Sequence, residues 1–367
     1  MYSGKRWRLR SRLRRPPWAP ADGLLTHSLL DAGKFRLLLA FMVVLVHTVG
    51  VPIGAAAVYL FFVLSGYWIS HLWTRQYAGT RSPYLTFLIS RGWRIFPLYW
   101  LCYGITAGVC ALSGRFGPET WERVATAEWL IRATWLVSSS GQEHLMRPAW
   151  SLDFEMQFYI VAPLVVMALR HPAARAIGAV LAFGLAVALA AGQPVWPRTG
   201  VHYGAFFLGG VLCQRSGWQP GTRLLGLATG LFAVSIALIV GWALAHRLGW
   251  SKVALANEVP WRDVVLVLFG FPLAIASCHR TGDAFDRHLG NVAYPLYLIH
   301  DSLDILFEQL LRGQGLFWKT ATLPLQWAVM LGAAAALYVW VDRPIDKRRQ
   351  QFVSTRAARS KVDTGIA

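Results

Sequence analysis

Charged residues are scarce in this chain, and acidic residues are the scarcest of them. Of its 367 residues, 15% are Asp, Glu, Lys or Arg and only 18 are acidic, whereas about 25% of residues are charged in soluble domains. Hydrophobic residues make up 55% of the chain. A protein with one ordinary core and a water-facing surface is therefore excluded, and the composition is typical of a chain that lies in lipid.

Cysteine is also rare, and no cysteine has a metal-binding spacing. The four cysteines lie within apolar stretches and form no CxxC pair or Cys/His cluster. The sequence therefore predicts neither a disulfide framework nor a metal site. The 36 Lys and Arg residues sit between long apolar runs, so the net charge of +18 does not predict a nucleic-acid partner.

Long apolar runs dominate the rest of the sequence. A membrane-spanning helix needs about 20 mostly apolar residues, and ten segments match this template, although 201–213 is short. The ten segments lie near residues 35–52, 55–74, 95–113, 150–169, 176–192, 201–213, 224–244, 264–279, 291–311 and 323–341. The sequence predicts an all-α, polytopic transmembrane bundle of about ten helices.

The distribution of basic residues predicts how the bundle is oriented. With the N-terminus inside, 26 of the 36 Lys and Arg residues fall in cytoplasmic segments, as the positive-inside rule requires. Both termini are therefore predicted to be cytoplasmic. The predicted parts are an uncleaved basic N-terminal arm at 1–34, a transmembrane domain at 35–343 and a basic C-terminal tail at 344–367. The longest outer loop is expected to hold a short interfacial helix near 129–137.

Polar groups inside apolar runs are functional candidates, because burying them in lipid is costly. In the first segment, Arg36 and His47 are 11 residues apart, which places them on one helix face about 16 Å apart. The alternative is that Arg36 is a membrane anchor and that His47 is an unrelated histidine bonded to neighbouring backbone.

Two later segments carry more of these groups. Ser151 and Glu155 share one helix face, whereas Asp153 either complements the helix dipole at the interface or takes part in chemistry. In the ninth segment, Tyr297 belongs to an acidic stripe with His300 alongside. Such a stripe cannot face lipid, so we expect it to line a polar cavity or another helix.

Two pairs near the start of the domain have both an ordinary and a functional interpretation. Arg91 and Arg94 lie one turn apart where the third segment begins. They are either membrane anchors or a pair suited to binding phosphate. Ser65 and Gly66 interrupt a bulky helix, which is typical of close helix packing.

Through an ordered series of motifs along the chain, the sequence resembles the acyltransferase-3 family of integral membrane acyltransferases, the O-antigen and exopolysaccharide O-acetylase type. Arg36 and His47 fit the family's R-x10-H, FFVLSGYWI at 61–69 fits FF-x-x-SG-[FY], and Arg91 and Arg94 fit RxxR. Three further stretches match family motifs: WSLDFEMQFYIVAPL at 150–164, YPLYLIH at 294–300, and VDRP at 341–344, which stands where VERP is usual.

The resemblance implies an O-acetyltransferase of the bacterial inner membrane. Such an enzyme moves an acyl group, usually acetyl, from coenzyme A on the cytoplasmic side to a hydroxyl of a sugar, glycan or glycolipid. The donor would be acetyl-CoA or another acyl-CoA, and no metal is implied. The family's helix-one arginine carries over to Arg36, and its RxxR arginines carry over to Arg91 and Arg94. We expect these three arginines to bind the nucleotide phosphates of coenzyme A at the cytoplasmic face. Many relatives also carry a fused extracytoplasmic domain; none is predicted here, so transfer is expected to finish within the membrane domain.

The resemblance also implies roles for the deeper residues. The family's essential histidine carries over to His47, as a general base or as an acyl relay. Its acidic residue carries over to Glu155, which would orient the imidazole or hold the acceptor. Substrate contacts are expected from four further residues: Ser65, Ser151, Tyr297 and His300. Met156 stands where a second Glu is common, so only Glu155 can take the place of the family's acid here.

Transport is the competing class of function. Intramembrane His, Asp, Glu and Tyr also build proton relays, and about ten helices suit a proton-coupled transporter or flippase of a lipid-linked saccharide. The cytoplasmic arginines and the lack of an evident inverted repeat favour the enzyme. A third alternative is a catalytically silent relative that acts as a membrane partner.

Overall fold

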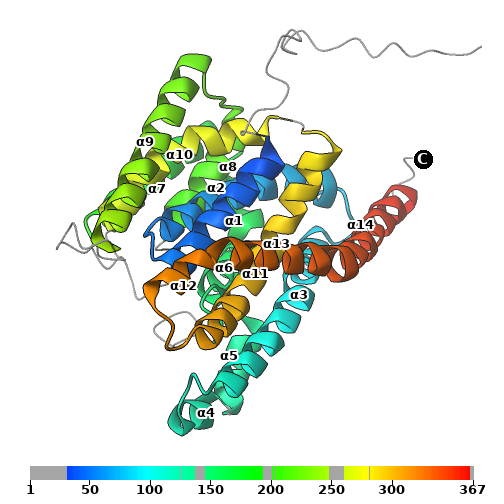
Figure 1. Cartoon of the computed structure of the whole chain (residues 1–367). Coiled ribbons are helices and arrows are strands. Elements are labelled where there is room, and N and C mark those ends of the chain that lie inside the picture. The colour runs from blue at the N-terminus through cyan, green and yellow to red at the C-terminus, as the bar shows by residue number, and fades with distance from the viewer. Residues whose placement is uncertain are drawn as a thin grey trace, which may run out of the picture.

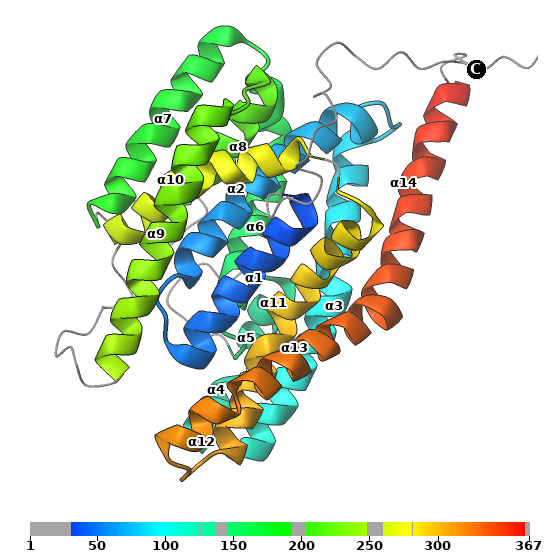
Figure 2. The ribbon, with the colours of Figure 1, turned by 45° about the horizontal axis from the view of Figure 1, so that its top comes forward.

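The protein is an all-α bundle, as predicted. The computed structural model describes residues 31–124, 126–136, 145–192, 201, 203–247, 260–280 and 282–363. In these ranges the chain forms helices and turns and no strand (Figure 1, Figure 2). The ten predicted segments correspond to α1 (Ala32–Val49), α2 (Gly54–Leu72), α3 (Pro83–Ser113), α6 (Ala149–Ala168), α7 (Pro172–Ala190), α8 (Gly204–Ser216), α9 (Thr222–Arg247), α10 (Pro260–Cys278), α11 (Ala284–Leu310) and α13 (Leu323–Leu337).

Eight helices of the described chain are long and apolar enough to cross a membrane. Two of the ten predicted segments differ from this set. Helix α8 has 13 residues, as its short segment suggested, and is too short to cross alone. Helix α11 has 27 residues but carries several charged ones, and its buried face includes His300 and Asp301. Its polar stripe therefore faces other helices, as expected.

The remaining helical elements lie at the ends of the spans. They are η1 (Trp73–Tyr77), α4 (Pro118–Val124), α5 (Ala127–Trp135), α12 (Leu316–Ala321), η2 (Tyr338–Asp342) and α14 (Arg343–Asp363). Helix α5 occurs where a short outer-loop helix was predicted, and the Thr126 side chain caps it by accepting a hydrogen bond from the Trp129 N–H. Elements η1 and η2 are π-helical turns, which are frequent at functional sites. The predicted tail is largely the helix α14, which projects from the bundle (Figure 2).

Helix α1 lies at the centre of the bundle, packed against α11 and α2 (Figure 2). Its start approaches α11 closely: a Cβ added to Gly290 would lie 2.8 Å from the Cα of Gly33. Asp286 of α11 also caps α1, because its carboxylate accepts hydrogen bonds from the Gly33 N–H (3.0 Å) and the Lys34 N–H (2.8 Å). These two N–H groups would otherwise have no partner within the helix.

The small residue Gly66 brings α2 against α8. A Cβ at Gly66 would collide with the backbone carbonyl of Phe207 in α8, and one at Gly210 would collide with that of Val63 in α2. The packing interpretation is therefore confirmed for Gly66. Its neighbour Ser65 faces a cavity on another side of α2.

Candidate active site

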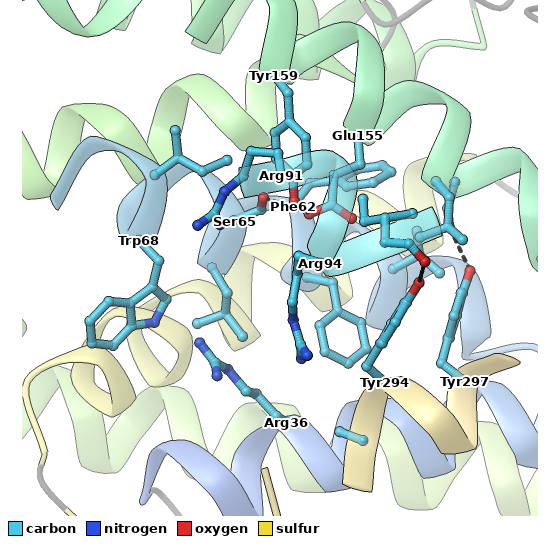
Figure 3. Close-up of a pocket in the computed structure, with 18 of the residues that line it drawn as sticks. Arg36, Phe62, Ser65, Trp68, Arg91, Arg94, Glu155, Tyr159, Tyr294 and Tyr297 are labelled. Atoms are coloured by element: carbon cyan, nitrogen blue, oxygen red, sulfur yellow. Dashed lines mark hydrogen bonds between the residues drawn. The ribbon is translucent and has the colours of Figure 1, made fainter. Parts of the chain in front are cut away.

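Helices α1, α2, α3, α6 and α11 border a chamber of about 220 Å³. Apolar side chains form much of its wall, among them Phe61, Phe62 and Leu152. Seven of the nine predicted site residues also line it: Arg36, Ser65, Arg91, Arg94, Ser151, Glu155 and Tyr297. The structure thus gathers residues from five separate motifs around one space (Figure 3).

Glu155 carries the acidic charge of the chamber and is held by two hydroxyl groups. Its Oε1 accepts hydrogen bonds from Ser65 Oγ at 2.9 Å and from Tyr159 Oη at 2.5 Å. Ser65 and Tyr159 therefore fix the carboxylate on the chamber wall.

Three arginines surround one end of the chamber, and each has different neighbours (Figure 3). The Arg36 guanidinium lies 5.7 Å from the Trp68 ring centre, and no carboxylate of the described residues pairs with it. Arg91 donates from Nη2 to Tyr77 Oη at 2.8 Å. Arg94 donates from Nη1 to both oxygens of Asp342. The two arginines of the RxxR motif therefore differ, because Arg94 is paired with a carboxylate and Arg91 is bonded to a hydroxyl group.

Two buried N–H groups at this end have no partner in the described structure. They are Arg91 Nε and Trp68 Nε1. Buried donors are nearly always satisfied in folded proteins. A ligand that accepts hydrogen bonds would satisfy both.

Beyond the arginines lies a larger cavity of about 570 Å³, which we call the vestibule. It shares four residues with the chamber: Arg36, Trp68, Arg91 and Arg94. Its outer wall comes from η2 and α14. The chamber and the vestibule are therefore neighbouring spaces separated by a ring of three guanidiniums and one indole.

Ser151 and Tyr297 lie on the chamber wall and are hydrogen-bonded to each other. Their oxygens are 2.6 Å apart, and each hydroxyl also lies 3.1 Å from the Pro148 carbonyl. This pairing joins the start of α6 to the middle of α11. The Tyr297 ring leads onward to His300, whose ring centre is 6.1 Å away.

His47 does not line the chamber and lies beyond Tyr297. Its ring centre is 5.2 Å from that of His300. His300 is fully buried, and its Nδ1 lies 3.2 Å from the Leu296 carbonyl, which can only accept. Nδ1 therefore carries the proton, and the buried Nε2 has no partner in the described structure. The two imidazoles form a pair at the end of α1 opposite Arg36.

The structure does not bring Glu155 to His47. The hydrogen bonds of Glu155 go to Ser65 and Tyr159, and none joins it to His47. The acidic group beside the histidine pair is Asp301, which follows His300 in α11. The hydrogen bonds of Glu155 thus do not place it in a triad with His47. The ring centre of His300 lies 6.1 Å from that of Tyr297, on the chamber wall, and 5.2 Å from that of His47.

Arg147 fixes Asp301 and was not identified from the sequence. Its Nε lies 2.5 Å from Asp301 Oδ1, its backbone N–H donates to Oδ2 at 2.9 Å, and its Nη2 donates to Asp304 at 2.7 Å. Asp301 is fully buried, and this clamp compensates its charge. The available sequence signal was weak: one arginine in a loop and an acidic stripe 154 residues away.

Asp153 is buried, and its burial bears on whether this residue only complements the helix dipole at the membrane interface. Its side chain is 1% exposed, and Gln157 donates to its Oδ1 at 3.3 Å. Its Oδ2 has no partner in the described structure. An exposed position that only complements the helix dipole is therefore excluded.

The chain belongs to the acyltransferase-3 family of membrane acyltransferases. The sequence model of that family, described as an acyltransferase domain, matches residues 35–343. The exopolysaccharide production protein ExoZ of Rhizobium meliloti (strain 1021) is 32% identical over 268 residues, which are 68% of this chain and 76% of ExoZ. No solved structure matches the chain.

Family membership decides between the enzyme and the transporter. The protein is an integral, multi-pass membrane enzyme that transfers an acyl group. No group of three or more His, Cys, Asp or Glu residues that could hold a metal occurs in the described part of the chain.

Proposed function

We propose that this protein transfers an acetyl group from acetyl-CoA to a hydroxyl of a polysaccharide, glycan or glycolipid in the bacterial inner membrane. The similarity to ExoZ, a protein of exopolysaccharide production, supports a saccharide acceptor. The vestibule lies at the end of the bundle where α1 and α14 begin, which the positive-inside rule makes the cytoplasmic side. Acetyl-CoA is a cytoplasmic metabolite, so this orientation suits the donor.

The observation that carries the proposal is the pairing of a cationic vestibule with a smaller, largely apolar chamber. Coenzyme A has the same two parts: an anionic nucleotide and a thin, uncharged pantetheine arm. The vestibule suits the nucleotide, and the chamber suits the arm with its thioester. Arg36 and His47 are about 16 Å apart along the axis of α1. This distance is comparable to the length of an extended pantetheine arm.

The arginines between the two spaces would bind the phosphates nearest the arm. Arg36 and Arg91 have no carboxylate partner among the described residues, so their charges are available to a phosphate. Arg94 is neutralised by Asp342, and its role is to shape the opening. The Nε of Arg91 and the Nε1 of Trp68 would donate to oxygen atoms of the donor.

His47 is the proposed catalytic base or acyl relay. As a base, it accepts the proton of the acceptor hydroxyl while that oxygen attacks the thioester carbonyl, and it returns the proton to the leaving thiolate. As a relay, its imidazole nitrogen attacks the thioester carbonyl and expels the coenzyme A thiolate, and the acceptor hydroxyl then takes the acyl group from the nitrogen and gives up its proton. His47 is only half-buried, which lets an acceptor reach it from the side opposite the vestibule.

Donor and acceptor would meet at the layer formed by Tyr297 and His300. The Tyr297 hydroxyl faces the chamber and, with Ser151, would contact the thioester oxygen. The His300 ring contacts the rings of both Tyr297 and His47, and it would hold the His47 imidazole in position. Glu155 and Ser65 would hold polar groups of the substrate within the chamber.

A labelling experiment tests this function. Membranes that contain the protein are incubated with acetyl-CoA labelled in the acetyl group, and the saccharide fraction is analysed by mass spectrometry. We expect O-acetyl label on saccharide that is absent from membranes carrying the His47→Ala variant. Uptake or release of saccharide without acetylation would contradict the proposal.

A further inference from the structure

One face of α14 forms a wall of the vestibule, although the family match ends where this helix begins. Arg343, Asp346, Lys347, Arg349 and Gln350 line the cavity. Ile345 and Arg348 do not, because the helical repeat turns them to the opposite side. The helix is thus divided into a cavity face and an outer face.

Helix α14 is firmly attached to α3. Arg349 donates to Ser90 Oγ at 3.0 Å, and Arg356 donates to Thr86 Oγ1 at 3.3 Å. The rings of Trp93 and Phe352 lie 5.4 Å apart. These contacts hold the cavity face of α14 in one position relative to Arg91.

The vestibule has an excess of positive charge. Six Lys and Arg residues and two carboxylates line it. Each carboxylate is taken up by one arginine, since Asp342 pairs with Arg94 and Asp346 with Arg349. The four cations left without a carboxylate partner among the described residues are Arg36, Arg91, Arg343 and Lys347.

These four cations form two groups. Arg36 and Arg91 lie at the opening to the chamber, whereas Arg343 and Lys347 are on α14, on the wall away from it. Arg343 and Lys347 are four residues apart and lie on one face of the helix. Two separated cationic groups match an anion with two separated phosphate groups.

We infer that Arg343 and Lys347 form a phosphate subsite of this enzyme. The inference rests on the proposed function, because the ligand it names is the nucleotide end of the acyl-CoA donor. Arg36 and Arg91 would bind the diphosphate that joins the arm, and α14 would bind the phosphate on the ribose. The helix that follows the family domain therefore sets the affinity for the donor.

Phosphate at this position has a second source. Helix α14 leaves the bundle near the predicted cytoplasmic surface, where anionic lipid headgroups also carry phosphate. The cavity favours the donor, because Arg343 and Lys347 line the same cavity as Arg36 and Arg91, so one anion could reach both pairs. An experiment with defined lipids distinguishes the two sources.

The test is coenzyme A binding by purified full-length protein in phosphatidylcholine nanodiscs. We expect the variant Arg343→Glu/Lys347→Glu to raise the Kd for coenzyme A at least tenfold. We expect a smaller increase for dephospho-coenzyme A, which lacks the ribose phosphate, and none for pantetheine. The control is Arg348→Glu, a single charge reversal of the same kind on the outer face of α14, which should leave all three Kd values unchanged.

Different results separate the possible failures. Wild-type protein that binds no coenzyme A would overturn both the proposed function and the subsite. Normal binding of coenzyme A by the double variant would overturn the subsite alone, as would an equal loss for coenzyme A and dephospho-coenzyme A. An effect that appears only when phosphatidylglycerol is added to the nanodiscs would assign the two side chains to lipid headgroups instead.

Discussion

Arg94 and Asp342 form an ion pair in which one guanidinium nitrogen, Nη1, lies 2.9 and 2.8 Å from the two carboxylate oxygens. The pair joins α3 to η2 across 248 residues of sequence. Its side chains are 28% and 6% exposed. The second arginine of the RxxR motif is thus held by the aspartate of the VDRP motif, and the two motifs form one structural unit at the vestibule.

Replacing Asp342 with Asn should destabilise the fold. The change leaves the Arg94 guanidinium without its carboxylate, and we expect a loss of about 2 kcal/mol, since one partner is partly exposed. Thermal unfolding in detergent measures it. The control is Glu308→Gln, because Glu308 is 72% exposed in its pair with Arg115 and such pairs contribute about 0 to 1 kcal/mol. Equal unfolding temperatures for the two variants would argue against a structural role of Asp342.

Replacing His47 with Ala should reduce acetyl transfer at least about a hundredfold, the typical contribution of a positioned general base. The measurement is the rate of acetyl label appearing on saccharide, at matched levels of folded protein. His171→Ala is the control, because His171 is exposed at the start of α7. A rate near that of wild type for His47→Ala would remove His47 from the mechanism.

Replacing Glu155 with Gln should reduce transfer more than replacing Tyr159 with Phe. The first change removes the only acidic charge that lines the chamber within the described structure, and we expect about a hundredfold loss. The second removes one of two hydrogen bonds to that carboxylate, so we expect a loss of about tenfold. Steady-state rates with labelled acetyl-CoA compare the two. The reverse order would indicate that the Tyr159 hydroxyl, and not the carboxylate, meets the substrate.

Replacing Gly66 with Ala should weaken the contact between α2 and α8. The new methyl group would collide with the Phe207 backbone carbonyl, and overpacking of this kind costs about 1 to 3 kcal/mol. Gly230→Ala in α9 is the matched control, because nothing lies within 4 Å of a Cβ built there. Unfolding temperatures should fall for the first variant and stay the same or rise for the second. A stable Gly66→Ala variant would show that the helices are able to separate there.

Much of the fold follows from the sequence because hydrophobic runs identify membrane helices directly. Each of the ten predicted segments overlaps a helix along most of its length. The polar stripe of α11 was also predictable, since an acidic face cannot meet lipid. The packing of α14 against α3 was not predictable, because nothing in the polar, basic sequence of α14 shows which helix it contacts.

The site was predictable as a set of residues but not as an arrangement. Spacing along one helix gives rotation, so Arg36 and His47 were placed on one face of α1. It does not show which side chains pack beside that face, such as Tyr297 on the chamber wall and His300 beside His47. Likewise, Glu155 was assigned to His47 by analogy with a triad, whereas its partners come from α2 and from its own helix. Partners such as Arg147 and Asp301 depend on tertiary packing, which a single sequence does not reveal.

The cap that Asp286 places on α1 has a consequence for the order in which the protein matures. The first helix emerges from the ribosome early, but its two capped N–H groups receive their partner only after some 250 more residues have been synthesised. Arg94 likewise precedes its partner Asp342 by 248 residues. In a nascent chain, the capped start of α1 and the Arg94–Asp342 pair can therefore form only after α11 and η2 have been synthesised.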